Sequence, residues 1–371
     1  MSISIKNLIL PLIIGCVALT FVFSQNGFLN VQTDTPVYTD QIRYFDGEIQ
    51  PTENTKLRSF KPFYGIVGSF LTPFLSPSEA ILAINIIFYF GLIISTFFFL
   101  KLLGFSEFYS SIGASWVATG YPVLKYGLAL LTDISGWFFA GASLVIFLLA
   151  IKQEKIKLFI LASVVAFVGS LCKETGILGL LFAGMYLTTL FLFERKVLYI
   201  KQLCAVAIPF IILQGLLIYI LFTTQANGVS FFDWFLFNKN GVGYGLHTLY
   251  YFSFTEMATF SVLWVYGLYS VYVVGKNLSS FPKKKVITGV CLFLAVLPPL
   301  IWPVFLTRVL YIGYLFIIPA ALLGLSFWEE NNKEKKVLYK TFLVLPIIVS
   351  VSLLLVANGG SLFSLINQNG Y

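Results

Sequence analysis

Acidic side chains gather in one short stretch near the start of the chain, where they could do acid–base chemistry. Asp34, Asp40 and Asp46 are three of the five aspartates, although charged residues make up only 11% of the sequence. A carboxylate held at a membrane surface could take the proton from a weak nucleophile such as a hydroxyl group. We expect a catalytic base among these three and favour Asp40, because Tyr44 follows it in a D-x-x-x-Y arrangement. An acidic, solvated loop is the plainer alternative.

Basic residues that could bind a phosphate follow this stretch and recur at the ends of later apolar runs. Arg58 and Lys61 precede the aromatic sequence PFYG, Lys173 lies in a tight turn, and Arg308 comes just before an apolar run. Guanidinium and ammonium groups bind phosphate through charge-assisted hydrogen bonds. The same residues could equally anchor a helix at the membrane interface by snorkelling, an interpretation that suits Lys61 better than Arg58.

Two further charged residues could support such a site. Asp133 opens an apolar run, where it suits the positive end of a helix and could serve as a cap alone. Glu174 follows Lys173, so the two could neutralise each other or form an intramembrane ion pair that marks a site.

The single histidine, His247, has no second His or Cys nearby, and we expect a loop residue rather than a metal ligand. No phosphate-binding glycine loop and no G-x-S-x-G motif occurs.

The elements that must position these residues are membrane helices. The sequence is 58% hydrophobic, its mean hydropathy is +0.89, and apolar runs of about 20 residues recur without alternation. These features predict an all-α polytopic membrane protein with about eleven crossings. The expected spans are Ile5–Phe23, Ala80–Leu103, Tyr109–Leu128, Thr132–Ile151, Ile156–Leu171, Thr175–Phe193, Leu198–Phe222, Tyr250–Val274, Val286–Phe305, Val309–Phe327 and Thr341–Val356.

The distribution of loop charges predicts the topology. Loops 152–157, 195–201, 276–285 and 333–340 carry more than half of the 24 lysines and arginines, and they share one side if Phe60–Leu75 lies at the interface without crossing. By the positive-inside rule that side is the cytoplasm. The N-terminus is then inside and the C-terminus outside, and all five aspartates fall on the outer face with Lys173, Glu174 and Arg308.

A single integral-membrane domain over 1–371 follows from this topology. Its first outer loop, 24–78, contains the interfacial helix, and a short outer tail covers 357–371. The net charge of +8 reflects loops that face anionic membrane lipids, so we expect no nucleic-acid partner. We favour the plasma (inner) membrane of a prokaryote.

Five short stretches resemble the GT-C superfamily of integral-membrane glycosyltransferases, which includes oligosaccharyltransferases, protein O-mannosyltransferases and bacterial lipid A aminoarabinose transferases. The stretches are TDTPVYTDQIRYFDGE in the first outer loop, LRSFKPFYG before the interfacial helix, LTDISGWFF at a span start, LCKETGILG at a tight outer turn and TRVLYIGYLFIIP late in the chain. The adjacent Asp-Glu pair that is frequent in the first loop of the family is absent here.

The resemblance implies an inverting glycosyltransferase that moves a sugar from a polyprenyl-phosphate donor to a hydroxyl of a lipid, glycan or protein. It implies Asp40 as the catalytic base, with Asp46 and Asp34 in reserve. Some members of the superfamily hold a divalent cation such as Mg or Mn through outer-side acids, and others do not. The resemblance assigns donor-phosphate binding to Lys173, Arg308 and Arg58, with Glu174, Asp133 and Tyr44 in support.

A different class of protein could use the same charges. A transporter or flippase of lipid-linked glycans would line a translocation path with them, but it should place ionisable residues near mid-span and often shows paired repeats. In this sequence the charges fall at the outer ends of spans and no repeat is evident, which favours the enzyme. A glycan polymerase or ligase is a narrower alternative.

Overall fold

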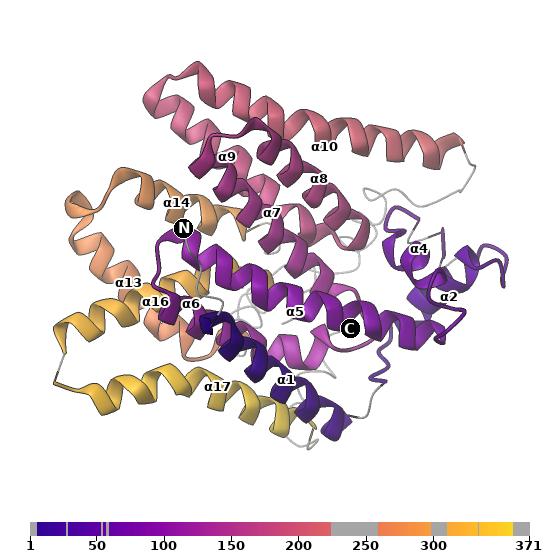
Figure 1. Ribbon diagram of the computed structural model, residues 1–371, viewed down its shortest axis with the longest axis horizontal. Helices are drawn as coiled ribbons and strands as arrows, with labels where there is room; N and C mark the ends of the chain where they lie inside the picture. Colours follow the sequence, from indigo (N-terminus) through magenta and orange to yellow (C-terminus); the bar gives the residue numbers. More distant parts are fainter. Residues whose placement is uncertain are drawn as a thin grey trace, which may run out of the picture. The chain divides into compact units, whose positions relative to one another are not determined.

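The computed structural model of the protein describes residues 6–26, 29–52, 55–56, 59–223, 259–297, 310–332 and 334–358 (Figure 1). Helices dominate these residues, and no strand occurs among them. The predicted all-α fold is confirmed.

Seven helices in the described part of the chain are long and apolar enough to cross a membrane. A shorter apolar helix, α8 (Ile156–Cys172), has the same character. The protein is therefore an integral membrane protein, whereas the number of crossings stays a prediction. The seven are α1 (Lys6–Asn26), α5 (Pro77–Leu103), α7 (Asp133–Gln153), the short 3-10 turn η2 (Glu174–Ile177) with α9 (Leu178–Glu194), α10 (Val197–Thr223), η5 (Tyr311–Gly313) with α16 (Tyr314–Asn331), and α17 (Lys336–Asn358).

The expected span Tyr109–Leu128 is wrong as a continuous helix. Helix α6 covers Glu107–Ala118 and stops, and a π-helical turn, η1, follows at Val123–Gly127. Pro122 lies between the two; it has no N–H to donate, and its ring clashes with a helix that continues past it. The backbone after η1 stays non-helical until α7 begins.

The chain divides into two compact units. Unit 1 consists of Met1–Gln25, Thr96–Lys125 and Tyr244–Tyr371, and unit 2 of Asn26–Ser95 and Tyr126–Gly243. One domain over 1–371 stays a prediction.

In unit 1, α16 packs against α13 (Leu263–Lys276), α14 (Lys283–Ala295) and α6. Pro346 lies inside α17, so the carbonyl four residues earlier, at Phe342, receives no helical hydrogen bond. The phenol of Tyr266 donates to that carbonyl over 3.2 Å, and the indole of Trp116 donates to the next one, at Leu343, over 2.9 Å. Side chains of α13 and α6 thus satisfy α17 where its own ladder is interrupted.

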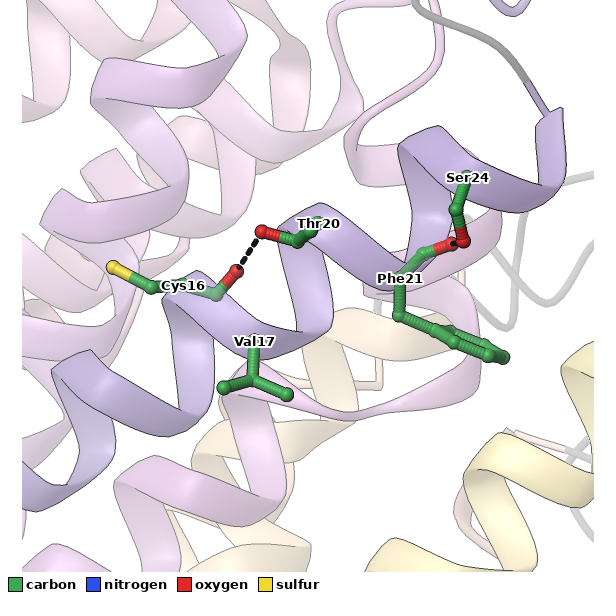
Figure 2. Close-up of a pocket in the computed structure, with 5 residues that line it drawn as sticks. All are labelled: Cys16, Val17, Thr20, Phe21 and Ser24. Carbon is green, nitrogen blue, oxygen red and sulfur yellow. Dashed lines mark hydrogen bonds between the residues drawn. The ribbon is translucent and has the colours of Figure 1, made fainter.

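Helix α1 presents a shallow hollow lined by Cys16, Val17, Thr20, Phe21 and Ser24 (Figure 2). The Thr20 hydroxyl donates to the carbonyl of Cys16 and the Ser24 hydroxyl to that of Phe21, at 2.9 and 2.7 Å. Because both hydroxyls bond to their own helix, this face is compatible with lipid. We place no functional site there.

In unit 2, α7 packs against α8 and α9, and α10 lies along α8 and α9 (Figure 1). Two short helices, α2 (Thr35–Phe45) and α4 (Phe63–Ser69), pack against each other before α5 begins. The predicted site residues of the first loop lie on and around these two helices.

Candidate functional site

The first loop is more ordered than the sequence predicts. The outer loop 24–78 was expected to contain one helix, at Phe60–Leu75, but α2 is a second, 11-residue helix with Pro36 in its first turn and Asp34 at its N-cap. Proline is well suited to that first turn because its φ is already helical and the missing N–H has no partner to lose. The sequence Asp-Thr-Pro was the signal for this helix.

Helix α2 separates the three candidate aspartates. Its buried face consists of Thr35, Tyr38, Gln41 and Ile42. Asp34 precedes Tyr38 by four residues and therefore lies on the same side of the helix. Asp40 is half-buried and follows Tyr38 by two residues, which places it about 200° around the helix. Asp46 is exposed beyond the end of α2, where it accepts a 3.0 Å hydrogen bond from Thr72.

Helix α4 lies within the segment Phe60–Leu75 that was expected to stay at the interface. It has 7 residues, about 10 Å of helix, against the roughly 30 Å of a hydrocarbon core. A Cβ at Gly68 would lie 2.5 Å from Ile42 Cδ1, so the absence of a side chain lets α4 approach α2 closely. The two helices form one small layer at the end of unit 2 where α5 and α7 begin.

Two ion pairs lie beside this layer. Lys173 Nζ is 3.0 Å from Asp133 Oδ1, and Lys61 Nζ donates to Glu174 Oε2. Asp133 and Lys61 are 2% and 3% exposed, so both pairs are largely removed from water. We call these four residues the charge cluster.

The charge cluster corrects two expectations from sequence. Lys61 is not a snorkelling anchor, because its side chain is buried and paired. Asp133 lies in the first turn of α7 but pairs with Lys173 across the chain instead of acting as a helix cap alone. Lys173 and Glu174, for which mutual neutralisation was one of two open alternatives, each form a salt bridge with a different element.

The turn that carries Lys173 and Glu174 depends on close backbone contact. A Cβ on Gly176 would lie 2.5 Å from the backbone carbon of Gly169 in α8. Real Cβ contacts are not that short, so η2 can lie against α8 only if this residue is glycine. The contact fixes where the two charged side chains leave the turn.

We expect Gly176→Ala to lower the free energy of unfolding by about 1–3 kcal/mol, because the added methyl group forces the turn away from α8. Gly184→Ala in α9 is the matched control: a Cβ there meets nothing within 4 Å. Its stability should stay equal or rise slightly, by about 0.5–1 kcal/mol. Unfolding in detergent measures both variants, and equal stability of the two would contradict the role of this contact.

Sequence reasoning missed a group of neutral polar residues in unit 2. Asn85, inside α5, is fully buried and donates to the carbonyls of Ala129 and Leu131 at 2.6 and 2.9 Å. Its Oδ1 accepts a 2.6 Å hydrogen bond from Tyr64 of α4. Burial raises the pKa of the Tyr64 phenol well above its usual value, so it stays protonated and remains a donor. A lone amide in an otherwise apolar span was the available signal.

Helix α2 is attached to the same region by further polar contacts. Thr132 Oγ1 donates to the Tyr38 phenol over 3.1 Å, directly beside Asp133. Gln41 Nε2 donates to the backbone carbonyl of Lys61 over 3.1 Å. The buried face of α2, which includes the side of Asp34, is therefore directed at the charge cluster.

Among the remaining predicted site residues, the structure describes only Tyr44. Tyr44 is exposed on α2. Arg58 and Arg308 lie outside the described residues, as does His247. Within the described part of the chain, no group of three or more His, Cys, Asp or Glu residues could hold a metal ion. The Mg or Mn site stays a prediction.

Comparison with solved structures finds membrane proteins of similar fold. The apo crystal structure of the Archaeoglobus fulgidus oligosaccharyltransferase superposes with a TM-score of 0.64 and 12% identity, over 96% of this chain and 56% of that one. Its complex with Zn and sulfate gives a TM-score of 0.63 and 12% identity, over 93% and 52%.

A third structure, of the same organism's AglB with an inhibitory peptide and a dolichol-phosphate, gives a TM-score of 0.60 and 13% identity, over 95% of this chain and 55% of that one. The chain thus spans about half the length of these proteins. No protein-family model and no curated protein matches it. The resemblance to GT-C glycosyltransferases is confirmed at the level of the fold.

Proposed function

We propose that this protein is a membrane glycosyltransferase that moves a sugar from a polyprenyl-phosphate-linked donor to an acceptor hydroxyl at the outer face. The supporting observation is that, in a fold similar to an oligosaccharyltransferase, helix α2, which has Asp34 at its N-cap, lies over the buried charge cluster. The neighbouring structures contain a dolichol-phosphate and peptides, including a tethered acceptor peptide, which supports a lipid-linked donor. The acceptor here is a lipid, glycan or protein.

The proposed base is an aspartate of α2. An acceptor hydroxyl attacks the anomeric carbon as a carboxylate removes its proton, while the bond from that carbon to the donor phosphate breaks with inversion. We assign this role to Asp34, because it shares the face of α2 that bonds to Thr132 and the Lys61 backbone. Asp40, which the D-x-x-x-Y arrangement favours, is the rival candidate.

The charge cluster would stabilise the negative charge on the departing phosphate. Fixed positive groups in a site that excludes water stabilise the negative charge that develops as the bond breaks. Lys173, whose side chain is 11% exposed, is the cluster's proposed contact with the phosphate. However, two lysines and two carboxylates sum to zero charge, so a phosphate needs additional cations. We propose that Arg58 and Arg308 supply them.

We propose the same membrane orientation as the loop charges predict. The N-terminus then lies in the cytoplasm of a prokaryotic cell and the charge cluster lies at the outer leaflet. A long-chain donor could reach this position laterally from the lipid, without leaving the membrane.

Native mass spectrometry of the gently purified protein tests the donor. We expect a co-purified polyprenyl phosphate, with or without a hexose-sized increment, or its uptake after a polyprenyl-phosphate sugar is added. The matched control is the Lys173→Ala/Arg308→Ala variant, which should retain ordinary phospholipid but lose the polyprenyl phosphate. Ordinary phospholipids alone in the wild-type protein after the addition would contradict the proposed function.

A further inference from the structure

The backbone between η1 and α7 is non-helical yet buried. Leu128, Ala129, Leu130 and Leu131 are each at most 2% exposed. Within a membrane protein such backbone needs protein partners, because lipid offers no hydrogen bonds. The N–H of Leu130 donates to the carbonyl of Asn30 over 3.0 Å, and its carbonyl accepts from Thr35 Oγ1 over 3.1 Å.

Asn85 satisfies the carbonyls on either side of Leu130. Its Nδ2 donates both of its hydrogens, one to the carbonyl of Ala129 and one to that of Leu131, and its Oδ1 accepts a hydrogen bond from the Tyr64 phenol. Neither an aspartate nor a leucine of similar size offers this combination. The amide lies about two helical turns into α5, where a polar group without partners would be costly.

These bonds connect the two halves of the charge cluster. Leu131 is two residues before Asp133, and Tyr64 is three residues after Lys61. Asn85 therefore connects the backbone that leads to the Lys173–Asp133 pair with the helix that follows the Lys61–Glu174 pair. The aromatic rings of Phe63 and Tyr64 pack on Phe88, one turn further along α5, which keeps α4 against the same helix.

We propose that Asn85 is a positioning residue for the donor-phosphate end of the site. It holds the start of α7 and the start of α4 in register, and through them the four charges of the cluster. This inference rests on the proposed function, because it assigns the cluster to the donor. Asn85 touches no reacting atom; it acts through Asp133 and Lys61.

The test compares steady-state kinetics of Asn85→Leu, Tyr64→Phe and the wild type with a polyprenyl-phosphate sugar as donor. Misplacement of catalytic groups by about 1 Å can cost about 100-fold. We expect Asn85→Leu to lower kcat/KM for the donor by about that factor while the KM for the acceptor stays unchanged. Tyr64→Phe, which loses one of the three bonds, should lower it by about tenfold. Ser95→Ala is the control in the same helix, because that hydroxyl donates to its own helix at Leu92.

A second measurement does not depend on catalysis. Cys172 is 1% exposed and precedes Lys173, so its reaction with a thiol reagent reports whether the cluster stays closed. In a background with Cys16, Cys204 and Cys291 replaced, we expect Asn85→Leu to speed this labelling and Ser95→Ala to leave it unchanged.

Three outcomes separate this inference from the proposed function. Wild-type kcat/KM and slow labelling in Asn85→Leu would overturn the positioning role. An equal rise in both KM values with a lower Tm would also overturn it, because that pattern indicates general destabilisation. Faster labelling in Asn85→Leu, together with a wild-type protein that transfers no sugar, would retain the role of Asn85 in the cluster and reject the transferase.

Discussion

Asp34→Asn should lower sugar turnover by about 10²–10⁴-fold, the range that general-base catalysis contributes. The amide keeps the size of the carboxylate but cannot take a proton from the acceptor hydroxyl. Because Asp34 is the N-cap residue of α2 and asparagine is about as favourable as aspartate at that position, the variant should fold as the wild type does. Transfer from a polyprenyl-phosphate sugar to the acceptor, measured at saturating donor, gives the comparison.

Two substitutions in the same loop make this result specific. Asp40→Asn changes the opposite side of α2, and Asp46→Asn changes an exposed carboxylate that is bonded to Thr72. Both should retain turnover within a few-fold of the wild type. A large loss in Asp40→Asn with normal turnover in Asp34→Asn would reassign the base to Asp40. Normal turnover in all three variants would reject an aspartate of the first loop as the base.

Lys61→Met should lower the free energy of unfolding by about 3–5 kcal/mol, because removal of one partner of a buried ion pair leaves the other charge uncompensated. The Lys61 side chain is 1% exposed and that of Glu174 is 20% exposed, so water can solvate the remaining carboxylate only in part. Lys61→Met/Glu174→Gln should recover most of the loss, since neither charge then remains. Unfolding in detergent measures the single and double variants.

The chain offers an exposed pair for comparison. Lys196 Nζ lies 2.7 Å from Glu194 Oε2, and the Lys196 side chain is 61% exposed. Lys196→Met should therefore change stability by less than about 1 kcal/mol. Equal effects of Lys61→Met and Lys196→Met would show that the Lys61–Glu174 pair is solvated and would remove it from the charge cluster.

The fold class could be predicted because its physical cause is local. A run such as Pro77–Leu103 must be helical in a membrane, since each backbone group then bonds within the segment. The break in the expected span Tyr109–Leu128 has a local cause as well: α6 ends at Ala118, and Gly120 and Pro122 follow it.

The partners within the charge cluster could not be predicted, because they depend on tertiary packing. Lys173 is adjacent to Glu174 in the sequence, yet its salt bridge is to Asp133 in α7. Lys61 resembles an interface anchor until α4 is placed against α5. The same holds for the faces of α2. In an irregular loop the three aspartates would be equivalent, whereas the helix puts Asp34 and Asp40 on opposite sides and leaves Asp46 beyond its end. Which of them acts as the base stays a prediction.

The non-helical stretch before α7 has a consequence for how the chain is made. Its hydrogen-bond partners Asn30, Thr35 and Asn85 all precede it in the sequence. Chains fold from the N-terminus as the ribosome extends them, so these partners have already been translocated or inserted when the stretch leaves the insertion machinery. Its unpaired backbone can thus be satisfied at once, without waiting for any later helix. The order of synthesis and the order of assembly therefore agree at a place where a delay would leave bare peptide groups in lipid.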